Sequence, residues 1–467
     1  MPRRKNISYE PVETYIPIGL PQIESLIIES DIVADRVRLL LHQVFLRHTM
    51  KRNSDDEQND FEQSHWVYLH SKLLKVIATK RYKRYIKFLE DNDILEIKRN
   101  STGGKSYHNG KYSQQYRLND QLLQKNGSPF SFRIELVRDH KCLRTVEKIS
   151  EYFSKTSEPG AGKLPLEPIH VSLNEMVNMV YFADEDALDF IKYSPALSDR
   201  DRDRQFILYR SVTNGHMQPT VDKFGQRFHH RLSNLKRELR SYIGFRGYEN
   251  RALVELDFAN SQPYFLSCVT GTVVRKLLPE FEPVLPLISD ITICSNFRFF
   301  SKLCTEGVYE YWMRETGTTD RNKAKEDIMK VMFGRRRPTK NAESKQLHKA
   351  FKNLFPSVYK LLQKIKSVDE RKLPFIREIY LDDYGIYRGN EAMHLNMSCM
   401  MQRLEARMVL KTISPKLIAE GLVPFITIHD SFITLAEHEQ AARKIIEAEF
   451  RTLDLVPPSI KTKSLVR

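Results

Sequence analysis

Hydrophobic and polar residues follow two periodicities along the chain. Residues 171–212 and 437–453 have helical spacing, and helices are expected to dominate from about 270 to 370. Runs rich in β-branched and aromatic residues predict a strand at "NRALVELDF" (250–258) and a hairpin at "VPFITIHDSFITL" (423–435). A further strand-rich patch is expected at "FIREIYLDDYGIYRG" (375–389). The pattern therefore predicts a mixed α/β (α+β) protein.

The N-terminal third has its own pattern. Two segments with helical spacing, 64–79 and 80–93, precede a predicted strand (94–100), a Gly-rich turn (101–113) and a second strand (114–118). Helix, helix, strand, wing and strand is the order of a winged-helix module, and its second helix is basic. An ordinary small α+β unit with a solvated basic face is the alternative. The basic residues on this helix are Lys80, Arg81, Lys83, Arg84 and Lys87.

Composition narrows the class of protein. The 467 residues are 41% hydrophobic and carry a net charge of +15, which suits a globular protein with a polyanionic partner such as nucleic acid. The five cysteines include no CxxC pair, so a disulfide framework or a cysteine zinc site is not expected. We expect neither a secretory signal nor a membrane span, and a reducing location such as the cytoplasm or wherever nucleic acid is replicated.

Two acids sit at the ends of apolar strands. Asp257 ends the strand "ALVEL", and Asp430 lies in the turn of the predicted hairpin. A carboxylate at the edge of an apolar sheet is costly unless it is paired or bound to a cation. Two of them on neighbouring strands would repel each other, unless divalent ions such as Mg²⁺ lay between them. Each acid alone also has a purely structural interpretation, because turns often contain Asp.

The segment between these acids, "RNKAKEDIMKVMFG" (321–334), carries complementary groups. On a helix, Arg321, Lys325, Met329 and Phe333 lie along one slowly winding face. Two cations can hold a triphosphate, and an aromatic ring can stack on a base or sugar. Gly334 would end the helix or leave room for a close partner. A basic amphipathic helix with no ligand is the alternative.

The order of these motifs resembles motifs A, B and C of the single-subunit polymerase superfamily, which contains the family A DNA polymerases and the phage-type single-subunit RNA polymerases. The resembling elements are Asp257, then Arg321-x3-Lys325-x7-Phe333-Gly334, then His429-Asp430. Two other segments, "VDKFGQRFHHRLSNLKRELR" (221–240) and "NLFPSVYKLLQKI" (353–365), are similar to segments before motif A and after motif B. The resemblance covers roughly residues 215–450.

The resemblance implies a role for each residue. Asp257, Asp430 and the backbone carbonyl of Phe258 would bind two Mg²⁺ ions, with Mn²⁺ as a possible substitute. Arg321 and Lys325 would grip the triphosphate, Lys325 would act in catalysis, and Phe333 and Gly334 would belong to the nucleotide pocket. Three residues, Arg227, His429 and Gln402, would lie near the primer or template. The partners would be a template, a primer and nucleoside triphosphates, with an accessory protein at the N-terminal domain.

Two positions bear on which sugar is used. In the family, the residue five after the motif A Asp helps to exclude or admit the 2′-hydroxyl. Here it is the bulky Gln262, and Phe333 replaces the usual Tyr before the motif B Gly, so the pocket favours dNTPs. Ser431-Phe432 after Asp430 is instead typical of the RNA polymerase branch. A single-subunit DNA-directed RNA polymerase therefore remains an alternative to a DNA polymerase of DNA replication.

Two further alternatives stay open. The segment Tyr380-Leu381-Asp382-Asp383 resembles the Tyr-x-Asp-Asp of reverse transcriptases. In that alternative, Asp382 and Asp383 would be the catalytic acids. A non-catalytic nucleic-acid-binding protein on a decayed polymerase fold is the other, although both acids and both cations remain. The predicted architecture is a right-hand polymerase with palm, fingers and thumb behind a possibly winged-helix domain. Its predicted parts are an N-terminal segment 1–60, a winged-helix-like module 61–150, a linker 151–169, thumb-like helices 170–214, palm 215–270 and 375–467, and fingers 271–374.

Overall fold

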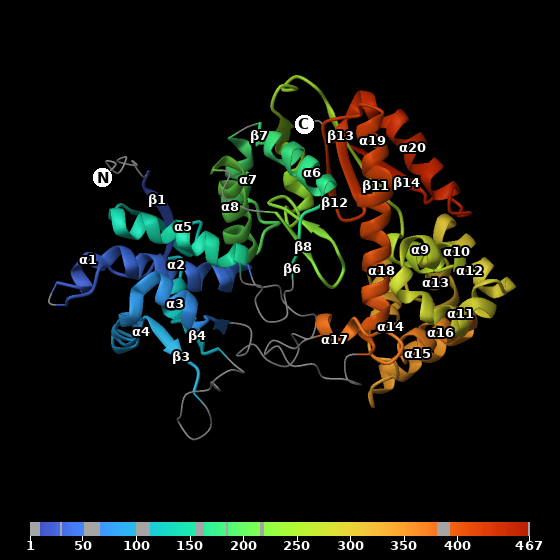
Figure 1. Cartoon of the computed structure of the whole chain (residues 1–467), viewed down its shortest axis with the longest axis horizontal. Coiled ribbons are helices and arrows are strands. Elements are labelled where there is room, and N and C mark those ends of the chain that lie inside the picture. The colour runs from blue at the N-terminus through green and yellow to red at the C-terminus, as the bar shows by residue number, and fades with distance from the viewer. Residues whose placement is uncertain are drawn as a thin grey trace, which may run out of the picture. The chain divides into compact units, whose positions relative to one another are not determined.

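The computed structural model describes residues 10–28, 30–50, 66–99, 113–155, 163–183, 185–214, 219–380 and 393–465. The chain divides into two compact units, residues 1–157 with 185–209 and residues 158–184 with 210–467, and the boundary between residues 209 and 210 falls within a helix. Each unit combines helices with small antiparallel sheets, which confirms the mixed α/β class (Figure 1). In the part of the chain that the structure describes, no helix combines the length and apolar character needed to cross a membrane.

The first unit contains two small sheets and the helices around them. Strand β1 pairs with β5, and β2, β4 and β3 form an antiparallel sheet in that order. Its strands are β1 (Val12–Pro17), β2 (Val67–Tyr68), β3 (Leu95–Ile97), β4 (Gln115–Leu118) and β5 (Phe132–Val137). Its helices are α1 (Ile23–Leu26), α2 (Ala34–Met50), α3 (Ser71–Ala78), α4 (Tyr82–Asp91), α5 (His140–Lys155), α7 (Asp186–Tyr193) and the greater part of α8 (Asp199–Asn214).

The predicted helix at 64–79 is partly wrong. Val67–Tyr68 forms strand β2, which pairs with Tyr116 and Gln115 of β4, and the helix begins only at Ser71. The His70 side chain accepts a hydrogen bond from the Lys72 amide and so caps this helix. Strands β3 and β4 lie where the sequence predicts them, while the predicted turn at 101–113 lies almost entirely outside the described residues.

The second unit is built on a four-stranded antiparallel sheet with the order β12-β13-β11-β14. The two smaller sheets of this unit have the orders β6-β8-β9 and β10-β7. The strands are β6 (Lys163–Leu164), β7 (Val180–Phe182), β8 (Thr220–Asp222), β9 (Phe228–His229), β10 (Ile243–Phe245), β11 (Leu253–Phe258), β12 (Phe425–Ile428), β13 (Ser431–Leu435) and β14 (Ile460–Ser464).

Helices account for most of the rest of this unit. A body of helices follows β11, and the long helix α18 packs against α9, α14 and α16 (Figure 1). The helices are α6 (Pro168–Met179), α9 (Ser261–Ser267), α10 (Gly271–Leu277), α11 (Leu285–Thr292), α12 (Ser295–Glu306), α13 (Val308–Thr316), α14 (Arg321–Phe333), α15 (Ala342–Leu354), α16 (Pro356–Ile365), α17 (Ile376–Ile379), α18 (Leu395–Arg407), the π-helical η6 (Met408–Ile413), α19 (Ser414–Ala419) and α20 (Glu439–Arg451).

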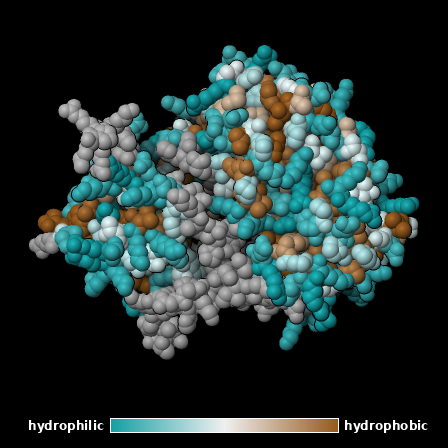
Figure 2. All heavy atoms as spheres, viewed as in Figure 1, coloured by the Kyte–Doolittle hydropathy of each residue, from teal (hydrophilic) through white to brown (hydrophobic). Residues whose placement is uncertain are grey.

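One continuous hydrophobic core joins this sheet to the helices. It runs from Leu256 and Phe258 of β11 to Trp312 of α13, Phe351 of α15 and Phe450 of α20. All five side chains are at most 2% exposed, so the strand that ends in the predicted acid is anchored on both sides. The face drawn in Figure 2 is mostly hydrophilic, with hydrophobic residues in small groups.

The predicted strand patch at 375–389 is wrong over its described part. Ile376–Ile379 forms the short helix α17, and Ile376 is fully buried in the core. A run of isoleucines beside aromatic residues fits a strand by propensity, but packing against the helical body outweighs that local preference. Residues 381–389, with Asp382 and Asp383 of the alternative reverse-transcriptase motif, lie outside the described residues.

Candidate functional site

Asp257 and Asp430 lie next to each other across two paired strands. Asp257 pairs in register with Ser431, and the Phe258 amide donates a hydrogen bond of 3.4 Å to the Asp430 carbonyl. Burial, and then the negative charge of Asp430, raise the pKa of Asp257 to about 6. The two acids are therefore close enough to repel each other, as the strand pattern predicts.

The hairpin turn holds Asp430 in a constrained position. Ile428 pairs with Ser431, so the turn consists of His429 and Asp430 alone. His429 has φ of +56°, a left-handed conformation that is uncommon for a residue with a side chain. The buried Ser431 hydroxyl donates to the Ile428 carbonyl at 3.0 Å and closes the turn. Non-glycine residues in this conformation are concentrated at functional sites.

Helix α14 presents the predicted cations. The Asp320 side chain caps it by accepting from the Asn322 amide, and the helix ends at Phe333 before Gly334. Arg321 donates to Glu310 at 2.7 Å and to Asn260 Oδ1 at 3.3 Å. Because Asn260 follows Asp257 by three residues, this contact brings the N-terminal end of α14 to the end of β11.

The other residues on this face of α14 differ in their surroundings. Lys325 is exposed and forms no hydrogen bond or ion pair with any residue that the structure describes. Phe333 is half-buried and packs against the core. Within the described residues, neither side chain forms a hydrogen bond or an ion pair with Asp257 or Asp430, so their place in a nucleotide pocket stays a prediction.

Gly334 lies where a side chain has no room. A Cβ atom there would come within 2.3 Å of the Lys330 carbonyl oxygen. The Gly334 and Val331 carbonyls each accept a hydrogen bond of 2.8 Å from the ammonium group of Lys366, which is 2% exposed. This buried lysine caps the C-terminal end of α14, and burial lowers its pKa to about 7.

A buried carboxylate that the sequence analysis missed joins two of the predicted residues. Glu405 of α18 accepts two hydrogen bonds of 3.0 Å from the Arg227 guanidinium and one of 2.7 Å from the Gln262 amide. Its side chain is 1% exposed. Burial raises the pKa of Glu405 to about 7 against the effect of Arg227, and Asp430 also raises it. Glu405 therefore lies within electrostatic reach of Asp430.

Gln402 lies one turn earlier on the same helix. Its amide oxygen would be only 2.5 Å from a Cβ atom at Gly225, so this side chain lies directly against the β8–β9 turn. Arg227 belongs to the same turn, where the Asp222 carboxylate accepts from the Arg227 amide at 3.1 Å. The structure thus brings Gln402 and Arg227 to one place, although the sequence assigns them only by resemblance.

A second group missed by sequence lies beside Asp257. Arg237 Nη2 is 3.6 Å from the Asp257 carboxylate, and Arg237 Nε is 3.8 Å from Glu255. Glu255 is buried two residues before Asp257, on the same face of β11, and also pairs with Arg240. These arginines partly offset the negative charge of the two strand acids.

The donor set allows a metal only with help from substrate. Within the described ranges, no group of three or more His, Cys, Asp or Glu side chains is arranged to hold a metal ion. Mg²⁺, however, commonly binds one or two carboxylates together with substrate phosphates. Burial and then the negative charge of Asp430 raise the pKa of Asp257, and a cation bound between the two carboxylates would offset both effects. The residues therefore fit Mg²⁺ as a substrate-bound ion.

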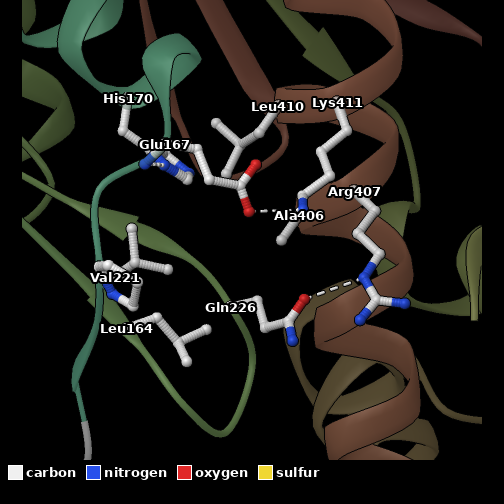
Figure 3. A pocket seen from close by; sticks show the side chains of 10 residues that line it. Leu164, Glu167, His170, Val221, Gln226, Ala406, Arg407, Leu410 and Lys411 are labelled. Carbon is white, nitrogen blue, oxygen red and sulfur yellow. Dashed lines mark hydrogen bonds and ion pairs between the residues drawn. The ribbon is translucent and has the colours of Figure 1, made fainter. Parts of the chain in front are cut away.

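A small pocket lies elsewhere in this unit, and Figure 3 shows the side chains that line it. It offers about 100 Å³ and is lined in part by Glu167, Gln226, Arg407 and Lys411. Glu167 accepts from Lys411 at 2.7 Å, and Gln226 accepts from Arg407 at 2.9 Å. These polar groups satisfy one another, and no predicted site residue is among those that line the pocket.

Comparison with known proteins gives little further identification. No protein-family model matches the sequence, and no curated protein matches it. Among solved structures, the chain is similar to the "POL domain of Pol1 from M. smegmatis complex with DNA primer-template and dNTP", with 12% identity and a TM-score of 0.30. The similarity covers 60% of this chain and only 55% of that chain.

Proposed function

We propose that this chain is a template-directed nucleic acid polymerase that transfers nucleotides to a 3′-hydroxyl, with dNTPs as its substrates. The observation that supports it most is the placement of Asp257 on β11 beside Asp430, which lies in the hairpin turn directly before the paired strand β13, with Arg321 of α14 in contact with Asn260. Two neighbouring acids can bind the divalent ions that promote nucleotidyl transfer, and a cationic helix can bind the triphosphate.

In this proposal, Asp257 and Asp430 hold two Mg²⁺ ions, with the Phe258 carbonyl as a further ligand. The bound ions would lower the pKa of the primer 3′-hydroxyl and neutralise charge on the leaving pyrophosphate. Arg321 and Lys325 bind the triphosphate, and the free ammonium group of Lys325 donates a proton to the pyrophosphate oxygen. Phe333 stacks against the nucleotide, and Arg227, His429 and Gln402 face the primer and template.

The proposed architecture assigns these parts to a right hand. The four-stranded sheet belongs to the palm, 215–270 and 375–467, the helical body 271–374 to the fingers, and 170–214 to the thumb. In the first unit, the basic helix α4 and the sheet β2-β4-β3 suit a winged-helix module that adds grip on duplex nucleic acid or recruits an accessory protein. Three exposed cations near the start of α4 form no ion pair with the described residues, and they are Lys80, Arg81 and Lys83.

A single-subunit RNA polymerase is the second candidate, and Ser431 is the residue that favours it. In the structure this serine closes the hairpin turn through its hydroxyl, which gives it a structural role independent of the nucleotide. We therefore weight Gln262 and Phe333 above it and retain dNTPs as the proposed substrates.

The test is primer extension with purified D257A and D430A. Each substitution is expected to abolish incorporation while folding and nucleic-acid binding persist, because each removes a metal ligand and no core contact. D290A, which removes an exposed acid of α11, is the matched control and should extend primers normally. Near-normal extension by D257A or D430A would refute this site assignment. Nucleic-acid binding by a wild-type chain that extends no primer would instead favour the non-catalytic alternative.

A further inference from the structure

Glu405 is a buried carboxylate with two different partners. It lies in the middle of α18 and is separated from Gln262 by 143 positions and from Arg227 by 178. A charge buried to this degree is costly unless it is paired and hydrogen-bonded, and here the Arg227 guanidinium and the Gln262 amide supply four contacts of 2.7–3.0 Å. The arrangement therefore ties three distant segments to one point.

That point lies beside the proposed chemistry. Gln262 is in the first turn of α9, five residues after Asp257, and Arg227 is on the β8–β9 turn. Gln262 thus follows the strand acid closely in sequence, and the negative charge of Asp430 reaches Glu405. Glu405 thus connects the residue proposed to face the sugar with an arginine proposed to face the primer.

Gln262 needs an anchor to act on a sugar. A glutamine side chain has three rotatable bonds and loses considerable freedom when it is fixed in one orientation. Phe333 has no hydroxyl with which to hold it. The hydrogen bond to Glu405 is the one that the Gln262 side chain forms within the described residues. Because Glu405 is itself held by Arg227 and by burial, it offers a rigid acceptor.

We infer that Glu405 is a positioning residue for sugar selection, which holds the Gln262 side chain where the 2′-hydroxyl of a ribonucleotide would lie. This inference rests on the proposed polymerase function and deepens it. Bulk at position 262 alone would then be insufficient, because an untethered side chain turns aside and admits the hydroxyl. Discrimination should depend on the hydrogen bond as well as on size.

The test measures kcat/KM for a dNTP and its matching rNTP on one primer-template. Q262M keeps the length of the side chain but removes its amide, and Q262A removes both length and amide. E405Q weakens the tether from the other side, and the double variant Q262M/E405Q reports whether the two act through one contact. The free energy of a hydrogen bond to a charged acceptor corresponds to a change of roughly tenfold or more in a ratio of rate or binding constants. Q262M and E405Q should therefore each reduce the ratio of kcat/KM for dNTP over rNTP roughly tenfold.

The control is E280Q. Glu280 accepts hydrogen bonds from Arg403 and Arg407 of the same helix α18 and is 20% exposed, so this variant disturbs a partly buried ion pair without removing a contact of Gln262. It should lower the unfolding temperature and leave the sugar preference unchanged. A purely structural role for Glu405 predicts the same result for E405Q, which separates stability from positioning.

Two results would overturn the inference. One is a Q262M variant with the wild-type dNTP preference, since that would show bulk to be sufficient. The other is a further loss of preference when E405Q is added to Q262M, because the two would then act separately. If E405Q does not fold, the comparison of Q262M with Q262A still shows whether the amide of Gln262 contributes to the dNTP preference beyond its bulk. A wild type that incorporates no nucleotide fails the proposed function itself, whereas an active wild type with unchanged ratios in the variants fails only this inference.

Discussion

The buried Lys366 should make the free energy of unfolding depend on pH. Its ammonium group is buried at the end of α14, where it donates to the Val331 and Gly334 carbonyls. Burial lowers its pKa from 10.5 to about 7. Between about pH 7 and 10.5, the unfolded chain holds a proton on Lys366 that the folded chain lacks. Stability should therefore rise with pH across this window, and below pH 7 the cost of burying the charged form is fully present.

The change in unfolding free energy that Lys366 causes is large enough to measure. At about 1.4 kcal/mol per pH unit, the difference between the two pKa values corresponds to about 5 kcal/mol in total. Of this, about 2 kcal/mol should appear between pH 7 and pH 9, a range in which urea unfolding is practical. K366M removes the titration and leaves the two carbonyls without a donor, which adds a constant loss that does not depend on pH.

The assay follows urea unfolding by tryptophan fluorescence. The chain has two tryptophans, and Trp312 is buried in the same helical body as Lys366, so a W66F background isolates its signal. The difference in unfolding free energy between the parent and K366M should grow from pH 7 to pH 9. K364M, which changes an exposed lysine of the adjoining helix α16, should show no such growth. A difference between the parent and K366M that stays constant from pH 7 to pH 9 would show that the folded chain does not lower the pKa of Lys366.

Three other variants test the roles of Gly334, Lys325 and the basic segment at the start of α4. G334A should lower unfolding free energy by about 1–3 kcal/mol and raise KM for the nucleotide, because the new Cβ would lie 2.3 Å from the Lys330 carbonyl oxygen; unchanged stability in denaturation would contradict this. K325A should lower kcat roughly 100-fold in steady-state extension assays, while K323A on the same helix should not, and equal losses would refute a specific role for Lys325. Replacing the three cations at and just before the start of α4 by alanine should weaken duplex binding. The salt slope of binding should fall by about 0.9 per lost phosphate contact in titrations, and an unchanged slope would exclude this segment from the interface. The triple variant for this binding test is K80A/R81A/K83A.

The sequence predicts the parts of the site that depend on local pattern. The hairpin of β12 and β13 follows from two apolar β-rich runs that leave only His429 and Asp430 for the turn. Helix α14 follows from helical spacing that ends at Gly334, where the structure indeed has no room for a side chain. In both cases a few neighbouring residues determine the conformation, so a single sequence contains the information.

The contacts that join distant segments could not be predicted in this way. Glu405 has the sequence appearance of a solvated acid on a helix, and nothing at spacings of 143 or 178 residues marks Gln262 and Arg227 as its partners. Lys366 likewise looks like an exposed lysine near a helix end. Tertiary packing buries both Glu405 and Lys366, and local periodicity does not indicate which polar residues of a helix will be buried.

Tertiary contacts also explain the two segments whose secondary structure the sequence predicts wrongly. Val67–Tyr68 forms a strand because β4 lies beside it, and Ile376–Ile379 forms a helix because Ile376 is buried in the helical core. Short apolar runs fit either structure by propensity, so the neighbours that the fold supplies decide the outcome. The long periodic segments, such as α14 and α20, were free of this ambiguity.

The most direct measurement is one extension assay that crosses DNA and RNA templates with dNTPs and rNTPs, with Mg²⁺ present or removed by a chelator. A two-metal nucleotidyl-transfer site should give template-dependent extension with dNTPs, much weaker extension with rNTPs, and none once the divalent ion is removed. Extension that persists in the chelator, or no extension with any template and nucleotide, would contradict the proposal that Asp257 and Asp430 form a nucleotidyl-transfer site.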